Sequence, residues 1–441
     1  MQFRSTKSKL NLVSFKEAVL NCLPLDGGLY VPDKVADIRQ FFFHMDEKTG
    51  FRELVAAVAP SLLEGEFNPV SAAKVSQSAY GFEPELIRLD KDFSLLNLYN
   101  GPTGVFKDFG IAFLSAMLEE FIKDSGQLNE TQTKANAPLL IISAARADTG
   151  ASMAHAFAGR KGIYLVLLYP SGPIRGLDPA AFAQNGGNII PVQVKGSFDD
   201  CQRLVIGTIN DREFADRYNV TSANAINAGR LLPQVFYYLY AFIQIKNQLS
   251  GDLFFSVPCG NFGNLIAGLY SWKFGMPVNG FIAAMNKNNA FGGYIDGKPF
   301  APGALVNTVS SALDVAVPSN YERLESFYAE SPAVMRNMVH PASIDDTLTL
   351  ETMKDAWKKY SVHIDPQTAV ALAAAQKWKD RAHTVVLATG HPAREAVLVK
   401  EAAGQALKIP EPLLALQKRC DPIAIIHPQL EAFEGAIASC F

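Results

Sequence analysis

Lys107 has the sequence surroundings of a reactive amine. It lies between Phe106 and Phe109, after a Gly-Pro turn and before an apolar run with helical periodicity. Because apolar surroundings disfavour the charged ammonium form, a larger share of such an amine is neutral and nucleophilic, as Schiff-base chemistry requires. The alternative is an ordinary solvated lysine paired with Asp108, and the local sequence leaves both interpretations open.

A glycine-rich loop much later in the chain has the pattern of an anion site. The apolar run Leu253–Val257 is followed by G-N-F-G-N at residues 260–264 and then by the apolar helical run Leu265–Trp272. Such a loop leaves free backbone N–H groups at the positive end of a helix, and its glycines let a phosphate come close. A simple tight turn is the alternative interpretation, since the loop is neither a Walker A sequence nor a G-x-G-x-x-G fingerprint.

Apolar runs that alternate with helical segments predict an α/β fold to position these residues. Runs rich in Ile, Leu and Val are separated by longer segments of helical periodicity, which is typical of βαβ units. Continuous apolar strands of this kind occur in parallel sheets covered on both faces. We expect strands at Leu139–Ser143, Ile163–Leu168, Ile189–Val194, Leu253–Val257, Phe281–Met285 and Thr384–Ala388, and helices at Ala151–Ala158, Asp199–Asn210, Leu231–Gln248, Thr368–Trp378 and Ala393–Ala403. Pro299–Gly303 and Glu330–Pro341 are expected to be surface loops.

Length and composition limit the class of protein. With 441 residues the chain exceeds a usual single core, so we expect two packed domains with a cleft between them, or one core with substantial appendages. A net charge of -3 without long lysine or arginine runs argues against a nucleic-acid partner. No apolar stretch approaches the roughly 20 residues that a bilayer requires, and the N-terminus lacks a signal-peptide pattern, so we expect a cytoplasmic protein without a membrane partner. Five scattered cysteines and seven dispersed histidines indicate neither a disulfide framework nor a metal site.

The lysine segment resembles the motif of a known enzyme family. L-Y-N-G-P-T-G-V-F-K-D-F-G at residues 98–110 resembles the lysine motif of threonine synthases, and the segment at residues 13–32 resembles their beginning. This resemblance implies a pyridoxal 5'-phosphate enzyme of fold type II, similar to tryptophan synthase β. Two open, mostly parallel sheet domains with flanking helices would enclose the cofactor in the cleft between them. Residues 1–90 would form an N-terminal cap and 91–441 the catalytic core, with a smaller domain at roughly 135–225 and the larger domain from the remainder.

Further motifs of this sequence resemble the motifs that bind the cofactor in the family. In the family a G-N-F-G loop holds the cofactor phosphate, and V-V-L-A-T-G-H-P-A-R at residues 385–394 resembles the strand whose threonine hydroxyl bonds the pyridine nitrogen. The D-T-G at residues 148–150 matches the end of the family's T-S-G-D-T-G loop, which closes on the substrate carboxylate and whose aspartate lies near the ring hydroxyl. The resemblance implies Lys107 as the catalytic, Schiff-base residue, and Asp148, Gly260, Asn261, Phe262, Gly263, Asn264 and Thr389 as further cofactor-binding residues. An alternative role for Thr389 is a helix N-cap before Pro392.

The segments expected to hold the substrate depart from the family. Ala145, Arg146 and Ala147 replace T-S-G of the family's loop, and Ala225 replaces a serine in the family's S-A-N-S-I-N-x-x-R. Lysine, serine and glutamine of another family segment have become Pro173, Arg175 and Asp178. The candidate substrate-binding residues are Thr149, Gly150, Asn224, Asn227, Arg230, Arg146 and Arg175. The arginines at 146 and 175 either rebuild an anion site with bidentate forks or are solvated surface residues.

Three hypotheses of function follow. The first is a threonine synthase, a lyase that converts O-phospho-L-homoserine and water into L-threonine and phosphate by γ-elimination and β-addition, acting as a monomer or homodimer. The second is a paralogue whose amino-acid substrate carries a phosphate or another leaving group. The third is a homologue that binds the cofactor without turnover. A panel of substrates discriminates among the three.

Overall fold

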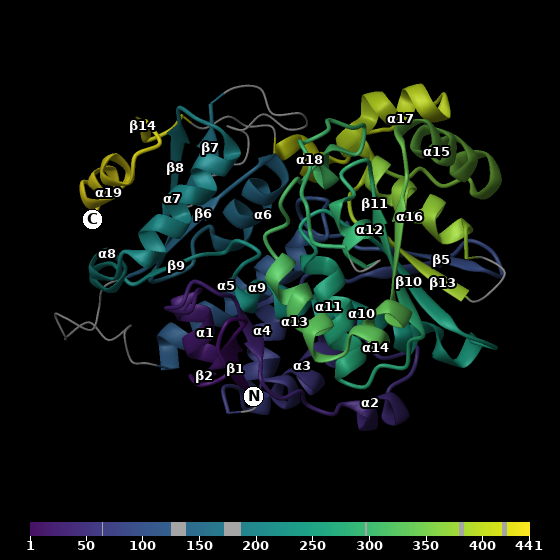
Figure 1. The fold of residues 1–441 in the computed structure, drawn as a ribbon, viewed down its shortest axis with the longest axis horizontal. Helices are drawn as coiled ribbons and strands as arrows, with labels where there is room; N and C mark the ends of the chain where they lie inside the picture. Colours follow the sequence, from purple (N-terminus) through teal and green to yellow (C-terminus); the bar gives the residue numbers. More distant parts are fainter. Residues whose placement is uncertain (64, 125–137, 172–186, 296–297, 379–382, 417–420) are drawn as a thin grey trace.

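Six strands form the larger of two mostly parallel sheets. The computed structural model describes the chain except for residues 64, 125–137, 172–186, 296–297, 379–382 and 417–420. In spatial order the larger sheet consists of β12 (Val339–Ser343), β11 (Gly280–Met285), β10 (Leu253–Pro258), β13 (His383–Ala388), β5 (Phe93–Asn97) and β4 (Glu85–Arg88) (Figure 1). All neighbouring pairs are parallel except β4 and β5.

Alternating residues of the central strands explain why helices cover both faces of this sheet. In β10, Phe255 and Val257 pack in one apolar cluster, and Phe254 packs in another on the opposite face. Such strands bury every residue, which accounts for their continuous apolar sequence. The first face carries α10 (Val235–Ile245), α11 (Gly263–Lys273), α13 (Tyr321–Glu330) and α14 (Pro332–Met338), and the second carries α15 (Asp346–Tyr360), α16 (Pro366–Gln376) and α17 (Ala396–Ala403).

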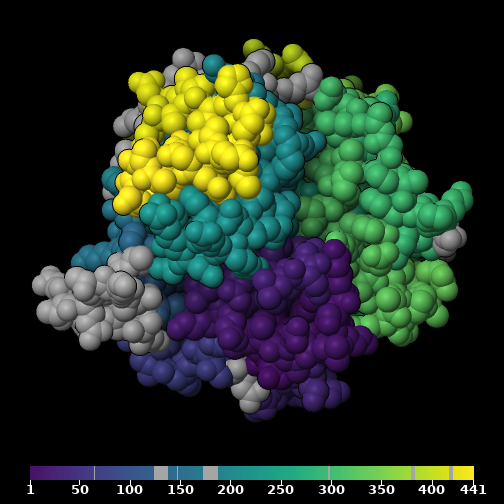
Figure 2. All heavy atoms as spheres, turned by 60° about the vertical axis from the view of Figure 1, so that its left-hand side comes forward, coloured from purple at the N-terminus to yellow at the C-terminus, as the bar shows by residue number. Residues whose placement is uncertain are grey.

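The smaller sheet has five parallel strands. In spatial order they are β14 (Ala424–Ile426), β8 (Ile189–Val194), β7 (Ile163–Pro170), β6 (Leu139–Ala144) and β9 (Val220–Thr221). One face packs on α6 (Ala147–Phe157) and the other on α7 (Phe198–Asn210), α8 (Arg212–Arg217) and α19 (Leu430–Ala438). Figure 2 shows the C-terminal residues, in yellow, lying on the teal segments of this sheet and its helices. Residues 424–438 therefore add a strand and a covering helix to the smaller sheet.

The N-terminal residues form a small antiparallel sheet and four helices. The sheet pairs β2 (Val13–Ser14), β1 (Gln2–Ser5) and β3 (Tyr30–Pro32). The helices are α1 (Phe15–Asn21), α2 (Arg39–His44), α3 (Phe51–Leu62) and α4 (Pro69–Ala79). Ser14 and Glu17 form a capping box that starts α1, and α4 packs against α5 (Lys107–Asp124). This segment therefore supports the helix that begins with the lysine.

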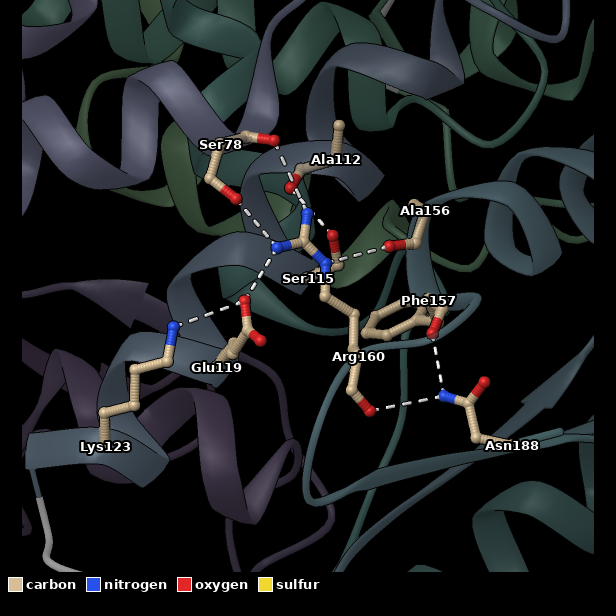
Figure 3. A network of polar contacts seen from close by, with 9 residues as sticks. All are labelled: Ser78, Ala112, Ser115, Glu119, Lys123, Ala156, Phe157, Arg160 and Asn188. Carbon is tan, nitrogen blue, oxygen red and sulfur yellow. Dashed lines mark hydrogen bonds and ion pairs between the residues drawn. The ribbon is translucent and has the colours of Figure 1, made fainter. Parts of the chain in front are cut away.

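A polar network around Arg160 joins three parts of the fold (Figure 3). Its Nη1 donates to Glu119 Oε2 of α5 and to Ser78 Oγ of α4, both at 2.8 Å. Asn188, just before β8, donates from Nδ2 to the carbonyls of Phe157 at 2.8 Å and Ile163 at 2.9 Å. The network thus ties the smaller sheet to the lysine helix and to the N-terminal segment.

The structure confirms the α/β fold and the strands expected from apolar runs, with ends that differ by at most two residues. The expectation that Glu330–Pro341 is a surface loop is wrong, because these residues hold α14 and the start of β12. Pro341 made this segment look like a loop, yet a proline is tolerated there because β12 is an edge strand. The expected division into domains stays a prediction, and β14 and α19 join the smaller sheet from beyond residues 135–225. Within the described ranges, no helix combines the length and apolar character needed to cross a bilayer.

Candidate active site

A cavity of about 890 Å³ lies where strands of both sheets end. Ala144 at the end of β6, Pro258 at the end of β10 and Thr389 just after β13 all line it. The start of α5, the start of α7 and the segment 311–317 complete its walls. The carboxyl ends of parallel strands are the usual place for a ligand in an α/β fold, so this is the candidate active site.

Lys107 is the first residue of α5 and faces Asp148 of α6. Its Nζ lies 3.6 Å from Asp148 Oδ2, and its side chain is 21% exposed. Burial lowers the pKa of Lys107; Asp148 acts in the opposite direction, and Arg230, Arg394 and Arg146 lower it further. The cavity thus favours a neutral amine more than water does.

Asp108 does not pair with the lysine. It is buried, and its carboxylate accepts hydrogen bonds from Thr103 Oγ1 and Ser152 Oγ, both at 2.6 Å, and from Thr103 N at 2.8 Å. It packs against Gly101 so closely that a Cβ there would lie 2.5 Å from Asp108 Oδ2. The alternative of a solvated Lys107 paired with Asp108 is therefore wrong: Asp108 fixes the turn that aims the lysine.

Asp148 binds two cations at once. Its Oδ1 accepts from Nη2 of Arg394, while its Oδ2 faces Lys107. Burial raises the pKa of Asp148, but Arg394 and Lys107 outweigh burial and lower it to about 2. Arg394 also donates from Nη1 to the carbonyl of Thr103 at 2.6 Å. A stable carboxylate therefore holds the amine in place.

The glycine loop at residues 260–264 presents donors to the cavity. Phe262, with φ of +59°, precedes α11, and no side chain caps the helix, so its first N–H groups are free for a ligand. Asn264 Oδ1 accepts from the hydroxyls of Tyr237 at 2.6 Å and Tyr238 at 2.8 Å, while its buried Nδ2 has no partner among the described residues. A Cβ on Gly260 would lie 3.2 Å from Leu313 Cα, and Asn261 Oδ1 accepts from Ser319 N at 3.1 Å. The loop is built as an anion site and pinned to the segment 311–319.

Thr389 lies in the cavity wall beside the lysine turn. Its carbonyl accepts from Phe106 N at 3.0 Å, and the residue lines the cavity. The alternative role of a helix N-cap is wrong for Thr389, because His391 caps the next turn through Nδ1, which accepts from Ala393 N at 3.1 Å.

The candidate substrate residues of the segment 222–230 have different positions. Asn224 lines the cavity, with its amide bonded to the backbone of Ala144 at 2.7 and 2.9 Å. Asn227 is fully buried behind the wall, where it donates to the carbonyls of Val19 and Ser222 and caps α9 (Ala228–Leu231). The structure does not bring Asn227 into the cavity.

Arg230 is a buried cation in the cavity wall, and no described carboxylate forms an ion pair with it. Its Nη1 donates to the carbonyl of Ala223 at 2.8 Å, and its Nε has no partner among the residues described. Burial lowers its pKa to about 10. Such a side chain is suited to a bound anion.

The loop that departs most from the family places Arg146 at the N-cap of α6. Its guanidinium lies 4.5 Å from the centre of the Phe198 ring on α7, and both residues line the cavity. Burial lowers its pKa, which Asp199, Asp314 and Asp148 counteract. Thr149 also lines the cavity, whereas Gly150 is buried in α6. Arg175, with Pro173 and Asp178, lies outside the described residues.

Two cavity residues escaped the sequence reasoning. Arg394 was visible only as part of a motif, and its partner Asp148 is 246 positions away in the sequence. Asp365 precedes Pro366 and therefore has the pattern of an ordinary helix N-cap, which it is, but it also lines the cavity. Only the fold brings these residues to the lysine.

Comparison with known proteins identifies the family. The family described as pyridoxal-phosphate dependent enzymes matches residues 88–390, and the threonine synthase N terminus matches residues 2–80. The threonine synthase of Serratia marcescens is 34% identical over 418 residues, which cover 94% of this chain and 93% of that protein. The chain belongs to the threonine synthase family. The family's enzyme from Escherichia coli (strain K12) is 33% identical over 417 residues, which cover 94% of each chain.

Solved structures of threonine synthases have the same fold. The Escherichia coli structure has a TM-score of 0.89 and 30% identity over 100% of both chains. The pyridoxal-phosphate-bound structure from Brucella melitensis has a TM-score of 0.86 and 26% identity, covering 100% of this chain and 99% of that one. The fold-type II architecture expected from the resemblance is thereby confirmed.

Pyridoxal phosphate is the cofactor of this family, and the cavity fits it. An aldehyde group reacts with the neutral form of an amine, and the lowered pKa of Lys107 favours that form. A phosphate requires N–H donors, and the uncapped start of α11 and the unpartnered Nδ2 of Asn264 supply them.

Proposed function

We propose that this protein is a threonine synthase, a lyase that converts O-phospho-L-homoserine and water into L-threonine and phosphate. The observation that carries the proposal is Arg230, buried in the same cavity as Lys107 and the glycine loop. A buried arginine without a carboxylate partner is costly unless an anion joins it. The phosphate ester of the substrate supplies that anion.

The cofactor roles follow the motifs. Lys107 would bind the cofactor through its amine, residues 260–264 would bind its phosphate, and the hydroxyl of Thr389 would bind its ring nitrogen. Asp148 would lie near the ring hydroxyl while it holds Lys107. When bound, the cofactor supplies an electron sink that makes the hydrogens at Cα and Cβ acidic.

Proton transfer falls to Lys107. The neutral amine would take the protons from Cα and Cβ in turn while the phosphate leaves from Cγ. Cγ would then gain a proton, water would give up one proton and add at Cβ, and Cα would be protonated again. The lowered pKa of Lys107 suits this work because the amine must exist in both forms during one turnover. Asp148, bound to Arg394, keeps the amine aimed in either form.

The substrate would be held by several residues of the cavity wall. Arg230 would bind the phosphate, and Thr149 and Arg146 would bind the carboxylate at the start of α6. Gly150 takes no part in binding, because its N–H donates to the carbonyl of Arg146 at 2.8 Å. Asn224 shapes the wall through its bonds to Ala144. Asn227 supports the segment from behind and takes no part in binding.

Arg146 favours a second candidate function. Its guanidinium faces the cavity against Phe198, where the family has small and hydroxyl-bearing residues. A cation beside the residues that would bind the substrate's carboxylate suits a different acidic amino acid with a leaving group. The second candidate is therefore a paralogue with such a substrate.

A substrate panel tests the proposal. The loaded protein is given O-phospho-L-homoserine, O-phospho-L-serine and O-acetyl-L-homoserine, and phosphate, acetate and amino-acid products are measured. Threonine and phosphate in equal amounts from the first substrate support the proposal, and turnover of another substrate alone selects the paralogue. Spectral change of the bound cofactor without any product indicates a protein that binds without turnover.

A control for the cofactor accompanies the panel. Borohydride treatment of the loaded protein fixes the cofactor covalently on Lys107, detected by peptide mass. Lys107→Ala removes the attachment and the activity, whereas Lys273→Ala, at the C-terminal end of α11 and outside the cavity lining, leaves both in place. Attachment to another lysine would contradict the role of Lys107.

We further propose that the protein acts in the cytoplasm as a monomer or homodimer, without a nucleic-acid partner. The net charge of -3 supports the last point, because phosphate backbones attract basic surfaces. Light scattering of the purified protein gives the oligomeric state, and larger assemblies would contradict the proposal.

A further inference from the structure

Gln367 is a buried side chain of the cavity wall whose amide has no partner. It is 6% exposed and is the second residue of α16, after Asp365 and Pro366. Its side-chain amide forms no hydrogen bond with any residue in the described ranges. An amide that is buried without a partner costs free energy, so a molecule bound in the cavity is expected to supply one.

Helix capping does not explain this glutamine. Asp365 already caps α16, because its side chain accepts from Thr368 N at 2.9 Å. A capping box would need glutamine or glutamate at the third position of the helix, and here that position is Thr368. The amide of Gln367 is therefore available to a ligand.

The start of α16 lies against the turn that follows β13. A Cβ on Gly390 would lie 2.6 Å from Asp365 Oδ2, so the two segments are in close contact. Gly390 follows Thr389, and both residues line the cavity together with Gln367. Thr389 is 8% exposed, and its hydroxyl likewise has no hydrogen-bond partner among the described residues. This part of the wall thus carries two polar side chains, a hydroxyl and an amide, that are both free for a ligand.

We propose that Gln367 is a further cofactor-binding residue and that, with Thr389, it binds the nitrogen edge of the pyridine ring. The inference rests on the proposed function, which assigns the hydroxyl of Thr389 to the ring nitrogen. A pyridine nitrogen without a proton accepts hydrogen bonds, and Gln367 Nε2 donates one beside the hydroxyl. A glutamine side chain has no charge and no acidic proton, so it binds the nitrogen without protonating it.

The variant Gln367→Leu tests the proposal, because leucine fills much of the same space without a donor. The full chain, freed of cofactor, is titrated with pyridoxal 5'-phosphate and with 1-deazapyridoxal 5'-phosphate, an analogue with carbon in place of the ring nitrogen. We expect the Kd for pyridoxal 5'-phosphate to rise about 2- to 12-fold, as for the loss of one hydrogen bond, while the Kd for the analogue stays unchanged. A merely structural role would weaken both ligands by the same factor, and that result would overturn the inference.

The matched control is Gln376→Leu. Gln376 is the last residue of the same helix, but it is exposed and lies outside the cavity lining. This variant should keep both Kd values of the wild type.

A second variant, Gln367→Glu, changes the charge at the nitrogen edge. A carboxylate beside the ring nitrogen favours a proton on that nitrogen. The ¹⁵N chemical shift of a cofactor labelled at the ring nitrogen should therefore move toward the value of a protonated pyridine. A chemical shift equal to that of the wild type would contradict the proposed contact.

Failure of this inference differs from failure of the proposed function. If Thr389→Val lowers the preference for pyridoxal 5'-phosphate over the analogue and Gln367→Leu does not, only the inference is overturned. If neither variant lowers it, the proposed place of the ring nitrogen is overturned as well. A wild type that makes no threonine, but whose preference falls in Gln367→Leu, overturns the proposed activity and supports the inference. Should Gln367→Leu fail to fold, equal Kd values of the wild type for the two ligands would overturn the inference by themselves.

Discussion

Single residues set the charge balance around the amine. Asp148 is the one carboxylate in ion contact with Lys107 within the described residues, and the arginines nearby all act against the ammonium form. Burial and the arginines therefore favour the neutral form of Lys107, whereas Asp148 favours its ammonium form. This balance leads to a prediction for the pH at which the amine becomes reactive.

Asp148→Asn should make Lys107 reactive at lower pH. Removing the negative charge removes the influence that raises the pKa of Lys107, while burial and the arginines remain, so the ammonium form loses its proton more easily. The rate at which the protein without cofactor takes up pyridoxal phosphate, measured against pH, should have its midpoint shifted downward. Asp46→Asn, in an exposed turn, should leave the midpoint in place. An upward shift would contradict the assigned charge balance.

A residue from a neighbouring element binds α5, the helix that begins with Lys107. Arg160 follows α6, yet its guanidinium reaches α5 and α4 together (Figure 3). Glu119 receives this arginine at 2.8 Å and also Lys123 at 3.6 Å, so one carboxylate has a half-buried and an exposed partner.

Arg160→Ala should destabilise the protein far more than Lys123→Ala. Loss of Arg160 removes the 2.8 Å charge-assisted bond of Glu119, whose side chain is only 16% exposed, which costs about 1–3 kcal/mol. Loss of the exposed Lys123 costs about 0–0.5 kcal/mol. The free energy of unfolding in urea measures both variants, and equal losses would show that the network does not join the elements.

Local sequence patterns predicted the strands that are buried on both faces of a sheet. They failed at edge strands and at strands whose polar residues have partners on distant segments. β10 and β13 were predictable because their residues Leu253–Val257 and Val385–Ala388 are apolar except for Ser256. β5 is a central strand, but its five residues include Ser94 and Asn97, whose polarity is explained only by partners on neighbouring segments, His383 and Glu85. At the site, Lys107 and the glycine loop were predictable because their chemistry lies in consecutive residues. Asp365 and Arg394 were not, because their roles depend on distant segments.

At the scale of the whole molecule, each sheet has one face in an apolar cluster of its own, while the other faces of both sheets share a third cluster. Phe433 of α19 is fully buried in the cluster of the smaller sheet, whereas the nearby Phe441 is 43% exposed and touches the Tyr164 ring at 4.9 Å between centres. We propose that the sheets belong to two units, as the sequence predicts, with β14 and α19 added to the smaller one.

Phe433→Ala should loosen the smaller sheet selectively. Removing a fully buried ring costs about 3–5 kcal/mol, and in a divided molecule that cost falls on one unit. Amide hydrogen exchange should accelerate in β6, β7 and β8 and stay slow in β10, β11 and β13. Phe441→Ala should change exchange little, because its ring is half exposed. Equal acceleration in both sheets would contradict the division into units.

The return of β14 and α19 to the smaller sheet sets an order on assembly. A ribosome makes the chain from its N-terminus, so β6, β7 and β8 leave it long before residues 424–438 exist. Until then the outer edge of β8 is unpaired, and the apolar surface of α7 that Phe433 and Ile437 cover is open to water. Phe198 and Asp199 of the cavity wall belong to this same helix. The nascent protein therefore acquires a finished catalytic wall only after residues 424–438 have been made, and until then this edge is the place where a chaperone would be needed.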